Sequence, residues 1–137
     1  MKIADANKEY NYTPTLVYSC QYHVIWATKY RRKALTAEVQ VRLKEIIKQV
    51  SEDMKFSVLE MEIMEDHVHL LLDVNPYVGI YKVISQIKGI SSNILRKEFP
   101  FLKTMIPTLW TRSKFISTVG SVSLEVVKKY IEGQKNK

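Results

Sequence analysis

The spacing of apolar residues predicts three amphipathic helices. The first covers about 36–54, where Thr36 can serve as the N-cap, and its apolar side holds Val39, Leu43, Ile46, Ile47, Val50 and Met54. The second covers about 78–98, and its buried stripe holds Ile80, Val83, Ile84, Ile87, Ile90 or Ser91, Ile94 and Leu95. The last follows a turn at Gly120 and a cap at Ser123, and one side carries Val126, Val127, Tyr130 and Ile131.

Four other stretches have the composition or the alternation of strands. Residues 15–28 are rich in β-branched and aromatic side chains, and 109–119 form a similar run. In 56–64, Leu59, Met61 and Ile63 are expected on one face, with Glu60 and Glu62 on the other. Residues 67–74 form the next strand, after a tight connection, and 100–107 are expected to be a loop between two prolines.

The order of these elements is β-α-β-β-α-β-α, which indicates an α+β fold of the ferredoxin-like type, related to RNA-recognition-motif proteins. It predicts an antiparallel sheet with two helices on one face and an added C-terminal helix. We expect residues 1–14 to form a flexible arm and residues 15–137 to form a single domain, because no repeat, low-complexity tract or inner linker interrupts them.

The composition indicates a soluble globular domain and a negatively charged partner. A chain of 137 residues with 46% hydrophobic residues is typical of one soluble globular domain. No apolar run is long enough for a membrane span, and the polar N-terminus lacks the pattern of a signal peptide. With Cys20 as the only cysteine, we expect a reducing, cytoplasmic location and no membrane partner. The net charge of +7 suits a polyanionic partner such as nucleic acid.

Two histidines stand one residue apart in the apolar strand HVHLLLDV. Because side chains alternate along a strand, His67 and His69 share a face, with their Cα atoms about 7 Å apart. Val68, Leu70 and Leu72 face the helix-packed core instead, so the histidines point to the open side of the sheet. Two such imidazoles can bind one cation, although they can also be half-exposed strand residues without a ligand.

Further ligands are candidates on the last helix. Tyr130 and Gln134 are four residues apart and therefore lie on one helix face. Tyrosine offers a phenol and glutamine an amide oxygen, but spacing alone does not separate this reading of Tyr130 from an aromatic residue packed beside Ile131. Gly133 weakens the helix just before Gln134, either as ordinary fraying or to let the glutamine turn toward a metal.

The chain resembles a known family along most of its length. The pair of histidines on a central strand and a tyrosine on a late helix resemble the HUH nucleases, and more narrowly the single-tyrosine transposases of the IS200/IS605 insertion sequences. The matching stretches occur in the family's order and cover nearly all of 22–134: HVIWATKYRRKAL, EDHVHLLLDV, ISQIKGISSNILRKEFP, LWTRSKFISTVG and VKKYIEGQ.

The resemblance implies a role for each candidate. His67 and His69 become metal ligands, Gln134 the third protein ligand, and Tyr130 the nucleophile that forms a 5′-phosphotyrosine. The donor set would suit Mg²⁺ or Mn²⁺, and the nitrogen ligands favour Mn²⁺. The expected substrate is single-stranded DNA with hairpins. The expected assembly is a homodimer with sheets paired edge to edge, in which Tyr130 and Gln134 reach the partner's histidines.

Other polar residues have two interpretations each. Lys29, Arg31 and Arg32 form a basic turn that either contacts phosphates or is simply solvated, and the same holds less strongly for Arg112 and Lys114. On the second helix, basic residues remain for solvent or phosphate: Lys82, Lys88, Arg96 and Lys97. His23 is expected to pack within its strand, and Asp66 either orients a histidine or shapes the turn.

Three other functions are compatible with parts of this sequence. A domesticated relative would process repeated hairpins with the same chemistry. A non-catalytic RNA- or single-strand-binding module would share the fold, but the sequence has no aromatic motif of that class and the histidine pair would then lack a purpose. A two-histidine phosphoesterase needs a second His-x-Ser/Thr motif, whereas His23 is followed by Val24 and Ile25.

Overall fold

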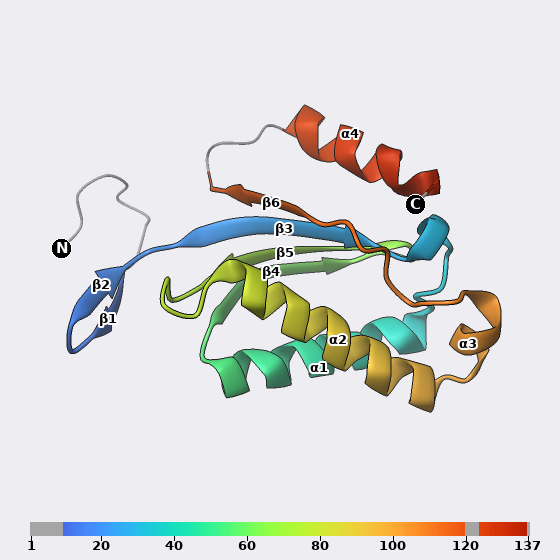
Figure 1. The fold of residues 1–137 in the computed structure, drawn as a ribbon, viewed down its shortest axis with the longest axis horizontal. Coiled ribbons are helices and arrows are strands. Elements are labelled where there is room, and N and C mark those ends of the chain that lie inside the picture. Colours follow the sequence, from blue (N-terminus) through green and yellow to red (C-terminus); the bar gives the residue numbers. More distant parts are fainter. Residues whose placement is uncertain (1–9, 120–123, 137) are drawn as a thin grey trace.

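A four-stranded antiparallel sheet forms the centre of the molecule, as Figure 1 shows in a computed structural model. The structure describes residues 10–119 and 124–136. The sheet contains β3 (Gln21–Ala27), β4 (Ser57–Ile63), β5 (His67–Asp73) and β6 (Phe115–Thr118), in the spatial order β4-β5-β3-β6. This is the ferredoxin-like order that the sequence predicts.

Helices lie on both faces of this sheet. The helices α1 (Ala37–Met54) and α2 (Ile80–Glu98) cover one face, and α4 (Leu124–Gly133) lies over the other (Figure 1). The core lies between the sheet and the first two helices, and its fully buried members include Trp26, Leu43, Leu70 and Ile84. None of the described helices is long and apolar enough to cross a membrane.

The positions of α1 and α2 agree with the apolar periodicity. The structure also decides between Ile90 and Ser91 as the buried residue of α2. Ser91 is fully buried on α2, where its Oγ accepts a hydrogen bond from Trp110 Nε1 at 3.0 Å, while Ile90 is 37% exposed. Thr36 occupies the N-cap position of α1 but makes no capping hydrogen bond through its side chain. The predicted cap at Ser123 and the turn at Gly120 lie outside the described residues, as do the side chains of Val126 and Val127.

The predicted strand over 15–28 is wrong in its extent, and so is part of the predicted arm. Residues 11–18 form a separate hairpin of β1 (Asn11–Thr13) and β2 (Leu16–Tyr18), joined by a two-residue turn at 14–15. The Asp73 carboxylate accepts hydrogen bonds from Asn11 Nδ2 at 2.9 Å and from the Cys20 backbone N–H at 3.0 Å. These two hydrogen bonds hold the hairpin at the end of the sheet, as an element separate from β3.

In β4 the expected alternation is wrong at Leu59, which is 47% exposed. The pairing with β5 shifts register between Val58 and Glu60, so that Val58 packs against the core in its place. A β-bulge of this kind moves side chains before it to the opposite face. Met61 and Ile63 keep their predicted side, and Glu62 faces away from the core beside His69.

The predicted strand over 109–119 is also shorter than expected, because β6 begins only at Phe115. The segment before β6 meets the end of β3 through an isolated antiparallel bridge between Thr28 and Trp110, and Lys88 Nζ on α2 donates a hydrogen bond to the Thr111 carbonyl at 2.7 Å. The preceding segment, expected to be a loop, contains α3 (Phe101–Met105). A short 3₁₀ turn, η1 (Lys29–Arg31), follows β3, and a second, η2 (Gln134–Asn136), follows α4.

Candidate active site between the sheet and the last helix

His67 and His69 project from β5 on the face away from α1 and α2, as predicted from alternation. Val68 and Leu70, their neighbours along the strand, are fully buried in the core on the other side. In the antiparallel pairing with β3, Ala27 stands opposite His67 and Ile25 stands opposite His69. The histidines therefore lie at the centre of the sheet rather than at its edge.

Asp66 holds the ring of His67 in a fixed orientation. The two side chains are joined by a 2.8 Å contact between His67 Nδ1 and Asp66 Oδ1, which leaves Nε2 of His67 as the nitrogen available to a ligand. Burial alone would raise the pKa of Asp66, but hydrogen bonds from His67 and Arg31 outweigh it and hold that pKa below its usual value. Of the two interpretations of Asp66, the structure therefore supports the orienting one.

His23 is a site residue that the sequence interpretation missed. Its Nδ1 lies 3.1 Å from His69 Nε2, and the two ring centroids are 5.3 Å apart. One of the two nitrogens must donate the hydrogen and the other accept it, so the contact constrains the tautomer of His69. Burial lowers the pKa of His69, and the neighbouring His23 adds to the shift. The ring is thus neutral at pH 7, as a metal ligand must be.

Tyr130 lies over the same face of the sheet. Its ring packs against Phe115 of β6 with centroids 5.2 Å apart, and Phe115 stands opposite Ile25, the residue paired with His69. The Tyr130 hydroxyl is buried and has no hydrogen-bond partner among the described residues. Burial raises the pKa of this phenol to about 12, so the free site keeps it protonated.

Gln134 has the burial expected of a ligand rather than of a surface amide. The residue is 4% exposed at the start of η2, and its Oε1 has no hydrogen-bond partner in the described part of the chain. A buried amide oxygen without a partner is costly unless something binds it. No group of three or more histidine, cysteine or carboxylate side chains in the described residues is arranged to hold a metal, so two histidines would need such an oxygen to complete a site. The donor set fits a divalent cation.

Arg31 connects the histidine strand to the last helix. Its guanidinium binds the Asp66 carboxylate at 2.9 Å, the Ile131 carbonyl at 3.0 Å and the Glu132 carboxylate at 3.1 Å. The Arg31 side chain is only 15% exposed. Asp66 in turn holds His67, so this network places the end of α4 beside the histidine pair.

Among the described residues, two other members of the predicted basic turn make no such contacts. Lys29 Nζ lies 5.0 Å from the centre of the Tyr30 ring, and Arg32 is exposed. The predicted contacts of Lys29, Arg31 and Arg32 with DNA remain predictions, although the position of Arg31 in the network favours a positioning role for it. In this chain Tyr130 and Gln134 lie over the sheet that carries the histidines, whereas the resemblance implies that they reach the partner's.

Comparison with known proteins identifies the family. The family described as "Transposase IS200 like" matches residues 16–134, which is most of the chain and includes both histidines, Tyr130 and Gln134. The chain belongs to the IS200-like transposases. It is a transposase of the IS200/IS605 type, a group that acts in DNA transposition.

Relatives of this transposase are similar over nearly their whole length. The ISDra2 transposase TnpA of Deinococcus radiodurans is 37% identical over 123 residues, covering 88% of each chain. The transposase for insertion sequence element IS200 of Salmonella typhimurium is 31% identical over 119 residues, covering 85% of this chain and 78% of its own length.

Solved structures show the same fold. A crystal structure of a Deinococcus radiodurans R1 protein assigned as a transposase has a TM-score of 0.84 at 34% identity and covers 93% of this chain and 99% of its own. A REP-associated tyrosine transposase bound to a REP hairpin has a TM-score of 0.50 at 10% identity, covering 95% of this chain and 69% of its own. At that identity the second likeness concerns the fold alone.

Proposed function

We propose that this transposase cuts and rejoins single-stranded DNA at hairpin-bearing ends, with Tyr130 as its nucleophile. The main support for this proposal is a pair of buried oxygen atoms without hydrogen-bond partners on one face of the sheet. Tyr130 Oη on α4 and Gln134 Oε1 on the following turn η2 have no partners among the described residues, and Arg31 binds the end of α4 between them. The hairpin bound to the REP-associated fold neighbour supports the choice of substrate.

The reaction transfers a phosphoryl group without net loss of a phosphoester. Tyr130 Oη, after losing its proton, attacks the scissile phosphorus and forms a P–O bond to the tyrosine. The bond from phosphorus to the 3′-oxygen breaks, and that oxygen takes up a proton to become a free 3′-hydroxyl. A 3′-hydroxyl of another strand can reverse the step, so rejoining needs no ATP.

A divalent cation, Mg²⁺ or Mn²⁺, would be held by His67, His69 and Gln134. Such an ion polarises a phosphate and offsets negative charge in the transition state. The protein's own part is to orient both imidazoles, through Asp66 for His67 and His23 for His69. Burial of the Tyr130 hydroxyl keeps water from the nucleophile.

The test uses a labelled stem-loop oligonucleotide with a flanking single strand, incubated with the protein and Mn²⁺. We expect a covalent protein–DNA adduct in denaturing gels that is lost on chelation and in His67→Ala and His69→Ala. Both side chains lie outside the core, so these variants should still fold, which a cooperative thermal melt checks. Folded variants that form the adduct without metal would refute the metal assignment, and no adduct from any stem-loop would refute the chemistry.

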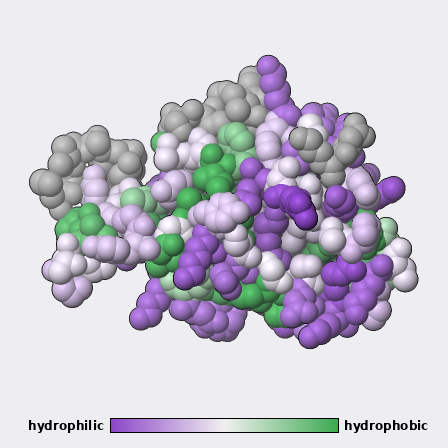
Figure 2. Space-filling view, in the orientation of Figure 1, coloured by the Kyte–Doolittle hydropathy of each residue, from purple (hydrophilic) through white to green (hydrophobic). Residues whose placement is uncertain are grey.

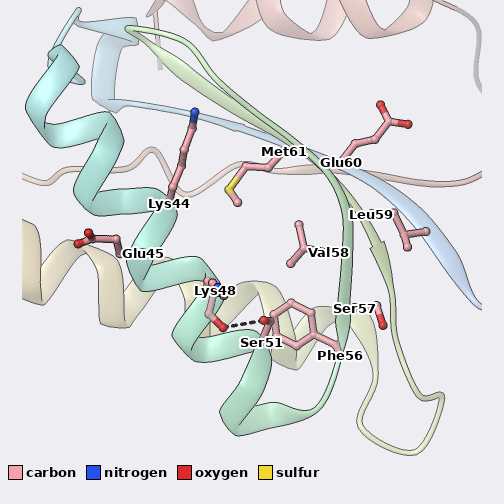
Figure 3. A pocket seen from close by; sticks show the side chains of 10 residues that line it. All are labelled: Lys44, Glu45, Lys48, Ser51, Phe56, Ser57, Val58, Leu59, Glu60 and Met61. Atoms are coloured by element: carbon pink, nitrogen blue, oxygen red, sulfur yellow. Dashed lines mark hydrogen bonds between the residues drawn. The ribbon is translucent and has the colours of Figure 1, made fainter.

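We also propose a homodimer formed through the β4 edge of the sheet. β4 pairs only with β5 among the described strands, and an open groove of about 600 Å³ runs between it and α1 (Figure 3). Val58 and Met61 point toward α1 in this groove, and its rim carries Lys44 and Glu60. An exposed edge strand offers unpaired backbone groups to a second copy, and a rim of mixed charge can complement itself.

Subunit mixing tells whether each site belongs to one chain or two. The structure supports completion within one chain, because Arg31 binds the Ile131 carbonyl of the same chain. If so, inactive His67→Ala mixed with inactive Tyr130→Phe stays inactive after subunit exchange. Recovered cleavage would instead establish the shared site that the family resemblance implies. A monomer at micromolar concentration would refute the dimer and leave the metal and tyrosine assignments standing.

A further inference from the structure

The 3₁₀ turn η1 holds two residues in a backbone conformation that L-amino acids rarely adopt. Tyr30 has φ 56° and ψ 20°, and Arg31 has φ 52°. The Arg32 backbone N–H donates to the Lys29 carbonyl at 3.2 Å and closes a tight turn around these two residues. Turns with both central residues at positive φ favour asparagine and glycine, because bulkier residues are crowded there. The backbone is therefore strained at both positions.

Hydrogen bonds from a buried threonine hold this turn against the strand that carries the histidines. Thr28, directly before η1, is fully buried, and its hydroxyl donates to the Arg32 carbonyl at 2.6 Å. Its backbone N–H donates to the Asp66 carbonyl at 3.0 Å. Backbone strain persists only where the surrounding structure maintains it, and it is concentrated at active sites and ligand-binding sites. Each of the two strained residues therefore needs an explanation.

Packing explains Arg31 but not Tyr30. The Arg31 guanidinium binds the Asp66 carboxylate and the Ile131 carbonyl, so its position serves the network described above. The Tyr30 side chain is 44% exposed, and no hydrogen bond within the described residues holds it. Its contact is with Lys29 Nζ, which lies over one face of the ring, 5.0 Å from its centre. A glycine would suit this turn better, so the aromatic ring itself is the feature to be explained.

The Tyr30 turn lies at the His67 end of the active site. It follows Ala27, which stands opposite His67 in the sheet, and it lies beside η2, which begins at Gln134 (Figure 1). Lys29 and Arg32, the residues on either side of the turn, form no ion pair within the described residues. An exposed aromatic ring therefore stands between two cations at the rim of the site.

We propose that the Tyr30 ring stacks on an unpaired base of the single strand, next to the scissile phosphate. This rests on the proposed function, which makes single-stranded DNA the substrate. Sites for single strands combine aromatic rings, which stack on bases, with cations that contact the phosphates. Lys29 covers one face of the ring, so the base takes the other. Because the strained turn already fixes the ring, little side-chain freedom is lost when the strand binds.

The test measures DNA binding by fluorescence anisotropy, in a Tyr130→Phe background so that no strand is cut. One probe is a stem-loop with a single-stranded thymidine flank, and the other has an abasic flank with the same number of phosphates. Tyr30→Gly removes the ring and suits the left-handed turn. We expect it to bind the thymidine probe about tenfold more weakly than the background protein and the abasic probe equally well. Tyr30→Phe keeps the ring and should recover the lost affinity.

Two controls separate stacking from folding and from exposed tyrosine in general. Tyr30→Gly should melt at or above the temperature of the background protein, because glycine relieves the left-handed strain. Tyr30→Asn, which also tolerates this conformation, should show the same loss of affinity. Tyr12→Ala removes a ring that is 67% exposed on the β1–β2 hairpin, which projects from the other end of the sheet (Figure 2), and should bind both probes normally.

Equal affinities of Tyr30→Gly and Tyr30→Phe for the thymidine probe would overturn the proposal. Equal losses on the thymidine and abasic probes would also overturn it, because the ring would then act without a base. A background protein that binds neither probe would refute the single-stranded substrate as well. Because binding is measured without cleavage, a failure of the tyrosine chemistry stays distinguishable from a failure of stacking.

Discussion

Arg31 provides the sharpest test of how the active site is assembled, because two interpretations of it make opposite predictions. As a DNA contact it would act on the substrate, and its loss would leave α4 in place. As the bridge between Asp66 and α4 it positions the last helix, and its loss would loosen that helix even without DNA. The substitution Arg31→Met removes the charge and the donors while keeping much of the side-chain volume.

The size of the effect follows from the three contacts. The hydrogen bond from the charged guanidinium to the Ile131 carbonyl contributes about 1–2 kcal/mol. The pair with Glu132, whose side chain is 63% exposed, adds little because solvent screens it. The charge-assisted bond to Asp66 contributes about 1.5–3 kcal/mol, but it stabilises the turn before β5 rather than α4. Docking of α4 should therefore weaken by about 1–2 kcal/mol, a 5- to 30-fold change in equilibrium.

The docking of α4 can be measured directly from the protection of its amides against hydrogen exchange. We expect protection of α4 amides to fall by about 5- to 30-fold in Arg31→Met, with α1 protected as in wild type. Arg32→Met is the matched control, because that side chain is exposed and makes no hydrogen bond or ion pair within the described residues. Equal protection of α4 in wild type, Arg31→Met and Arg32→Met would refute the positioning role. An equal loss of DNA affinity in both variants would then favour the contact role.

Three further predictions concern titratable groups of the site. His23→Phe keeps an aromatic ring but removes the contact with His69, so calorimetry should show about tenfold weaker Mn²⁺ binding, and unchanged affinity would contradict the role given to His23. Burial raises the pKa of Tyr130 above that of a free phenol, so the free energy of unfolding of the wild type, measured in urea, should fall from pH 10 to pH 12. Tyr130→Phe should lose less stability over the same range. Parallel pH dependences of the two proteins would count against a buried, protonated Tyr130. The pKa of Asp66 is lowered, so its contribution to the free energy of unfolding is present at neutral pH and is lost as the pH falls below about 4. Asp66→Asn should therefore lose less stability than wild type over this acid range. An equal loss in the two proteins would argue against the network.

Features set by local periodicity could be predicted from the sequence. The stripes of α1 and α2 follow the helical repeat, and the placement of His67 and His69 away from the core follows from alternation along one strand. Both depend only on residues within one element, so no tertiary information was needed.

Features that depend on distant partners could not be predicted. Arg31 meets the Ile131 carbonyl across 100 positions of sequence, and His23 meets His69 across 46. The contact of His23 requires the register between β3 and β5, which no repeat in either strand specifies. The bulge at Val58 and Glu60 likewise appears only when β4 pairs with β5, and it reversed the predicted orientation of Leu59.

The nucleophile is the central claim, and the mass of the covalent adduct tests it most directly. The protein is incubated with Mn²⁺ and a stem-loop oligonucleotide, digested with a protease and a nuclease, and analysed by tandem mass spectrometry. We expect a nucleotide joined through its 5′-phosphate to Tyr130, and no adduct from Tyr130→Phe, which lacks one oxygen but keeps the ring packed on Phe115. An adduct on another residue, or one that persists in Tyr130→Phe, would contradict it.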